Sequence, residues 1–78
     1  MNKTQLLSLI RETVGRNGYA RCVVGVSLSK GGIRFNVDEV TMNKVYVTLT
    51  GTGTGTSVAL ESLSRNQLRK INDNIIQQ

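Results

Sequence analysis

The sequence predicts a two-layer α+β domain, in which a helix, a four-stranded antiparallel meander and a second helix follow one another. Apolar residues recur at helical spacing near both ends of the chain and alternate with period two between them. They also change from odd to even positions across the run 50–56. Alternate side chains of a strand point to opposite faces, so the chain must fold back within this run. The resulting sheet has one apolar face, and we expect both helices to pack on it, because they alone offer an apolar cover.

The first helix is expected over residues 4–14. Either Asn2 or Thr4 can cap its start, and either Gly15 or Gly18 can supply the left-handed residue that ends it. The apolar residues at helical spacing, which form the inner stripe, are Leu6, Leu7, Ile10 and Val14.

A first hairpin is expected around the turn at residues 30–32, because an alternating run lies on each side of it. Pairing Leu28 with Ile33 would set the register and bring all the apolar side chains to one side. Val26 would then oppose Phe35, and Val24 would oppose Val37. Cys22 shares this phase and is expected to point inward.

The join between the two hairpins contains a second change of phase. Apolar positions are odd up to Val37, whereas Val40 and Met42 are even. A β-bulge near residues 38–39 would restore the phase and allow a turn at residues 43–44. An irregular loop over the same residues is the alternative.

The glycine-threonine run predicts a second hairpin. A two-residue turn at Gly53 and Thr54 would place Leu49 opposite Val58, and a loop over residues 52–55 gives the same pairing. Either version also sets Val47 opposite Leu60. All these apolar side chains then lie on one face.

The second helix is expected to begin at Ser64, since Gln67 three residues later completes a capping box. Arg65, Arg69 and Asp73 would face water. The inner stripe would consist of Leu68, Ile71, Ile75 and Ile76.

Length and composition indicate one small domain spanning residues 1–78, since so short a chain cannot build a second core. The single cysteine, Cys22, excludes an internal disulfide and indicates a reducing compartment. The apolar stretch 6–10 is too short and too interrupted for a membrane span. We therefore expect a cytoplasmic protein that does not insert into a membrane.

Catalysis is not expected, because the chain has no histidine and Cys22 has no basic partner in the sequence pattern. One cysteine without histidine cannot build a zinc site. The glycine-threonine run lacks the third glycine of a dinucleotide fingerprint and the Gly-Lys-Ser/Thr of a P-loop. We predict no cofactor, no metal and no small-molecule substrate.

Ten lysines and arginines against five acidic residues give a formal net charge of +5. Such a charge suits a nucleic-acid binder, yet it is also ordinary for a small soluble domain. The basic residues are spread along the chain, and the second sheet face is left uncovered in a monomer. The candidate contacts on that face and on the second helix are Arg21, Arg34, Tyr46, Arg65 and Arg69.

Two functions follow as hypotheses. The first is a non-catalytic protein-interaction module, either a homodimer or a small adaptor or inhibitor that docks through the open sheet face. The alternative is a module that contacts the phosphates of DNA or RNA without strong sequence specificity. The interaction module is preferred, because it requires fewer residues to be placed correctly.

Overall fold

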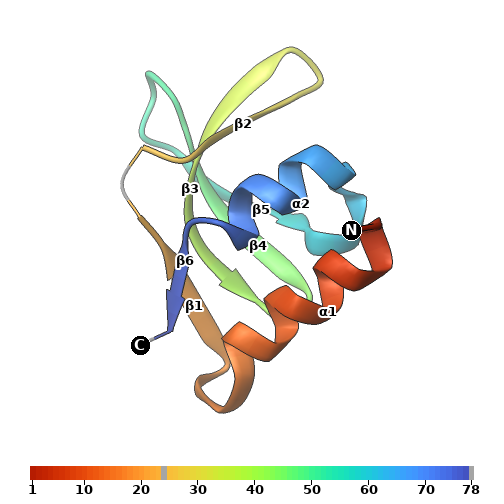
Figure 1. The fold of residues 1–78 in the computed structure, drawn as a ribbon. Coiled ribbons are helices and arrows are strands. Elements are labelled where there is room, and N and C mark those ends of the chain that lie inside the picture. The colour runs from red at the N-terminus through yellow and green to blue at the C-terminus, as the bar shows by residue number, and fades with distance from the viewer. Residues whose placement is uncertain (24, 78) are drawn as a thin grey trace.

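The apolar segments of the chain assemble into a sheet with two helices on one side (Figure 1). The computed structural model describes residues 1–23 and 25–77. The helical elements are α1 (Lys3–Val14), η1 (Gly15–Asn17), η2 (Leu60–Ser62) and α2 (Arg65–Asn72). The strands are β1 (Tyr19–Cys22), β2 (Ser27–Lys30), β3 (Ile33–Thr41), β4 (Lys44–Leu49), β5 (Gly55–Ala59) and β6 (Ile75–Gln77).

The predicted two-layer α+β class is confirmed. The strands lie in the order β5-β4-β3-β1-β6, and β2 pairs with β3 beyond the end of β1. All pairs are antiparallel. Both helices contribute to a single core with the inner face of the sheet, and its most deeply buried members are Ile10, Val14, Ala20, Val40, Val45, Leu60, Leu68 and Ile71.

The segment predicted as the first strand forms two strands, β1 and β2, and both pair with β3. β1 pairs with residues 39–41 of β3, and β2 pairs with residues 33–36. Gly25 lies between them with φ +96°, a conformation outside the extended strand region. Val24, for which we predicted a partner in Val37, lies outside the described residues. Instead, Val37 donates its N–H to the carbonyl of Val26 at 2.9 Å, so the two strands stay linked to β3 across the break.

The predicted register of the first hairpin is wrong by two residues. Lys30 lies opposite Ile33, and Leu28 lies opposite Phe35. Gly31 and Gly32 have φ +60° and +78°, and positive φ at both positions is what a two-residue type I′ turn requires. Because the shift is even, Leu28 still faces the core, while Ile33 at the tip is 49 % exposed.

The predicted bulge is confirmed. The β3–β4 register shifts between Val37 and Glu39, which leaves Asp38 as the extra residue and returns Val40 to the core. The turn that follows lies at Met42 and Asn43, one residue earlier than predicted. The Thr41 side chain stabilises this turn, since its Oγ1 accepts a hydrogen bond from the N–H of Lys44 at 3.1 Å.

The second hairpin has the predicted parity and a different register. Val45 lies opposite Val58 and Val47 lies opposite Thr56, so the predicted pairing of Leu49 with Val58 is wrong by four residues. Leu49 instead donates its N–H to the carbonyl of Thr54, which places the loop at residues 50–53. An even shift leaves every side chain on its predicted face, and Leu60 is fully buried after it.

Helix α1 has a predicted cap residue at each end and begins at Lys3, one residue earlier than predicted. Asn2 accepts the backbone N–H of Gln5 at 2.8 Å, and the Gln5 side chain accepts the N–H of Asn2 in return. Gly15 is the C-cap residue, and Gly18 takes the left-handed conformation after η1.

Helix α2 has the predicted capping box but is shorter than predicted. It ends at Asn72, and Ile75 and Ile76, assigned to its inner stripe, belong to β6, which pairs with β1. Asn74 explains the end of the helix, because its backbone N–H donates to the Ile71 carbonyl and its side chain donates to that of Lys70. The β-branched isoleucines then continue as an extended edge strand.

Replacing Ser64 with alanine is expected to lower the free energy of unfolding by about 1 kcal/mol, because the capping bond to the N–H of Gln67 is lost. Urea unfolding followed by circular dichroism measures the loss. Ser8→Ala on the exposed side of α1 is the matched control. Equal stability of the two variants would contradict a stabilising role for the cap.

Candidate functional site: the open face of the sheet

The face of the sheet turned away from the helices is polar and carries the predicted contacts Arg21, Arg34 and Tyr46. We call this surface the open face. Strand pairing places its members in rows that alternate with the buried valines. All of them are exposed or half-buried: Tyr19, Arg21, Arg34, Asn36, Glu39, Thr41, Lys44, Tyr46, Thr48 and Ser57.

One row crosses the centre of the open face. Arg21 of β1 lies opposite Glu39 of β3, which lies opposite Tyr46 of β4. Adjacent strands are about 4.8 Å apart, so the Cα atoms of Arg21 and Tyr46 lie about 10 Å apart. Tyr46 is 43 % exposed. Two of the five predicted contacts are therefore brought together with a carboxylate between them.

The neighbouring row adds two residues that sequence reasoning missed. Tyr19 lies opposite Thr41, which precedes the turn to Lys44. Tyr19 lies two residues before Arg21, and Lys44 lies two residues before Tyr46, so each points to the same face as its neighbour. The sequence carries a signal for Tyr19, because it shares the phase of Arg21.

The other three predicted contacts lie elsewhere. Arg34 is on the open face but at the opposite end of β3, opposite Ser29, about 15 Å from Glu39 along the strand. Arg65 and Arg69 are exposed on α2, in the other layer of the molecule. The predicted set is thus divided between two surfaces.

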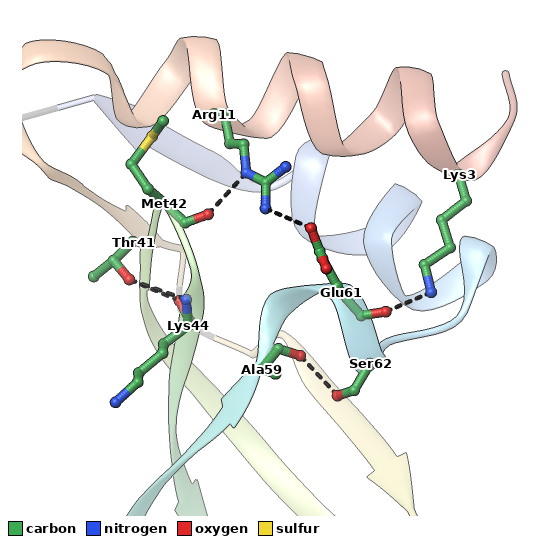
Figure 2. A network of polar contacts seen from close by, with 8 residues as sticks. All are labelled: Lys3, Arg11, Thr41, Met42, Lys44, Ala59, Glu61 and Ser62. Atoms are coloured by element: carbon green, nitrogen blue, oxygen red, sulfur yellow. Dashed lines mark hydrogen bonds and ion pairs between the residues drawn. The ribbon is translucent and has the colours of Figure 1, made fainter.

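A polar network at one end of the molecule uses several basic residues for structure (Figure 2). Arg11 of α1 donates to the carbonyl of Met42 at 2.8 Å and forms an ion pair with Glu61 at 3.2 Å. Lys3 donates to the carbonyl of Glu61. These contacts fasten α1 to the β3–β4 turn and to η2.

Other cations are also engaged with polar partners. Lys30, Arg65 and Lys70 donate to Ser62 Oγ, Met1 O and Ser27 O. Among the described residues, the basic side chains without a hydrogen bond or ion pair are Arg16, Arg21, Arg34, Lys44 and Arg69.

Two carboxylates moderate the charge of the open face. Asp38 accepts a hydrogen bond from Thr48 Oγ1 at 2.6 Å, which places it on the same side as Glu39. Three cations, Arg21, Arg34 and Lys44, against these two acids leave an excess of one positive charge. The open face is mixed in charge, with no continuous basic stripe.

The bulge in β3 and the break between β1 and β2 border a hollow of about 690 Å³, lined by Arg21, Cys22, Asn36, Asp38 and Glu39 among others. Cys22 is half-buried and packs against the core, as predicted. Burial, and secondly the negative charge of Asp38, raises the pKa of its thiol from 9.0 to about 11. Its thiol is therefore protonated at neutral pH, which disfavours a nucleophilic role.

Alkylation of Cys22 by iodoacetamide at pH 8 is expected to be roughly 100-fold slower than in the urea-unfolded chain, because two pKa units separate the thiolate fractions. The native rate should rise up to about pH 11, and Asp38→Asn should increase it at a given pH below that. Equal native and unfolded rates would contradict the assigned environment.

Within the described parts of the chain, no three cysteine, aspartate or glutamate side chains come together as a metal site would require. Neither helix there is long and apolar enough to cross a lipid bilayer. Comparison with protein-family models, with curated proteins and with solved structures found no match to this chain.

Proposed function

We propose that this protein is a non-catalytic interaction module that docks on another protein through the open face of its sheet. The central row Arg21–Glu39–Tyr46 carries the proposal. Tyrosine and arginine are the residues that most often dominate binding energy at protein interfaces. Here they stand on strands β1 and β4 of one sheet, with β3 between them, so little backbone freedom is lost when a partner binds.

The surroundings of this row also suit a protein partner. Asn36, Thr48 and Ser57 are small polar side chains that can donate and accept hydrogen bonds without carrying charge. Glu39 and Asp38 beside Arg21 give this surface both signs of charge for a partner to match, which favours specificity. A surface selected for phosphate would instead present cations without adjacent carboxylates.

The test uses the immobilised protein as bait in a lysate of its native host, with quantitative identification of what is retained. A partner bound through the open face should be retained by the wild type and by Arg69→Glu, and lost from an Arg21→Glu/Tyr46→Ala double variant. Arg69 is the matched control, because it is exposed, free of described polar partners and on the other layer.

The purified partner then permits a direct measurement. Hot-spot losses of about 2 kcal/mol correspond to a roughly 30-fold weaker Kd for Tyr46→Ala. Retention of the same proteins by all three baits would show that the open face is not the docking surface.

Nucleic-acid binding is the second candidate, favoured by one observation. Tyr19 and Tyr46 accompany Arg21 and Lys44 at one end of the open face, and aromatic side chains on a sheet can stack on unpaired bases. Fluorescence anisotropy with a generic duplex and a single strand over a salt series tests it. Phosphate-driven affinity should fall steeply with salt, and no association at low salt excludes this function.

A further inference from the structure

We propose that two copies of this protein associate by pairing their β5 strands across a two-fold axis. β5 pairs with β4 on one side, and among the described residues no strand pairs with its other side. Four of its five residues are exposed, and the fifth, Val58, is half-buried. Unpaired strand edges of this kind are templates for pairing with another chain.

The unpaired side of β2, which lies off the main strand order, is treated differently. β2 also has a strand partner on one side only, but α2 covers its outer backbone. Gln67 Nε2 donates to the carbonyl of Ser29 at 2.7 Å, and Lys70 Nζ donates to that of Ser27 at 2.9 Å. The fold thus blocks one edge with helix side chains and leaves β5 open.

The backbone direction identifies which groups of β5 are free. The Thr54 carbonyl and the Leu60 N–H are both bonded toward β4 or its preceding turn. Strand alternation therefore directs the N–H and C=O groups of Gly55, Ser57 and Ala59 outward. The Ala59 carbonyl accepts a hydrogen bond from Ser62 Oγ at 2.7 Å, so Gly55 and Ser57 are the residues with both outward groups free.

These two residues fit a second copy of the same strand. In an antiparallel pair centred on Thr56, Gly55 of each copy lies opposite Ser57 of the other, and each pair exchanges two hydrogen bonds. Two-fold symmetry brings like side chains together, which penalises charge. Residues 50–60 contain no charged residue and no proline, so nothing in this segment repels its own copy.

The size of the contact limits its strength. A five-residue strand is about 17 Å long, and its pairing buries less than the roughly 800 Å² per partner of a standard stable interface. We therefore expect a concentration-dependent dimer with a Kd in the micromolar range or weaker, on the order of 10⁻⁵–10⁻³ M. Pairing through β5 leaves the Arg21–Glu39–Tyr46 row free. The proposed dimer and the proposed function can therefore be tested independently.

Sedimentation equilibrium between about 10 µM and 1 mM tests the pairing over the Kd range expected above. The mean mass of the wild type should rise with concentration toward twice the 8.5 kDa of one chain. Thr56→Lys places two lysines opposite each other and should weaken association at least about tenfold. Ser8→Lys adds the same charge on exposed α1 and should behave as the wild type. A wild type that stays monomeric, or a Thr56→Lys variant that associates equally, overturns the proposal.

Disulfide trapping locates the contact independently of charge. In a Cys22→Ser background, oxidation should cross-link Thr56→Cys, because directly opposed residues of a non-hydrogen-bonded pair have Cα atoms about 4.5 Å apart, within disulfide range. Ser29→Cys, exposed on the covered β2 edge, is the matched control. Equal cross-linking of the two variants would show random collision and overturn the proposal.

Discussion

Ile71→Ala is expected to lower the free energy of unfolding by about 2–5 kcal/mol, because it leaves a cavity where α2 meets the core. Ile71 is fully buried. A chain of this length has a total stability of only about 4–12 kcal/mol, so the variant should unfold in much less urea and melt more than about 10 °C lower.

Ile33→Ala is the matched control for this change. The same atoms are removed from a side chain that is 49 % exposed at the tip of the β2–β3 hairpin. Its loss should stay below about 1 kcal/mol, since little buried apolar surface is removed. Similar urea midpoints for the two variants would contradict the position of α2 against the core.

Deleting Tyr46 is expected to abolish the folded state, whereas deleting Asp38 is expected to preserve it. Tyr46 separates Val45 from Val47, and without it these two buried residues must point to opposite faces of the sheet. Expelling either valine removes about 1.5–3 kcal/mol of burial and brings a polar neighbour inward, which a small domain does not tolerate.

Asp38 is the extra residue of the bulge, so its removal leaves Val37, Glu39 and Val40 in regular alternation with their present partners. The expected loss is about 1 kcal/mol, mainly the hydrogen bond from Thr48. Thermal melts by circular dichroism and amide NMR dispersion distinguish the two outcomes. A folded Tyr46 deletion, or an unfolded Asp38 deletion, would contradict the observed register.

Parity explains what could be predicted of the fold. A side chain's face depends only on whether its position is odd or even, so the inward residues Leu28, Val47 and Val58 were assigned correctly. Registers shifted by two or four residues preserve that parity, and the hydrophobic pattern cannot distinguish between them. The backbone conformation of the turn glycines makes that choice, as it does at Gly31 and Gly32.

The C-terminal segment shows a different limit. Ile71 and Ile75 have helical spacing, so the local pattern predicts a longer α2 than the structure has. Asn74 ends the helix, and pairing with β1 then decides the structure of residues 75–77. That pairing joins segments more than 50 residues apart in the sequence, and no local window contains it.

The candidate site was predicted in part for the same reason. Arg21, Arg34 and Tyr46 share a face through parity, and their common exposure was accessible from the sequence. The distance that separates Arg34 from the others depends on the register of β3. The sequence predicts that Arg65 and Arg69 lie on the outer side of α2. It does not predict how far these two side chains lie from the open face of the sheet.

The bonds from Gln67 and Lys70 to the β2 backbone have a consequence for biosynthesis. The ribosome releases β2 about 40 residues before the helix that shields it. Until then, the nascent chain exposes the backbone groups of β2 as well as those of β5, and both can pair with other chains. A chain truncated before Arg65 should therefore aggregate during expression, even though strands β2 to β5 are all present.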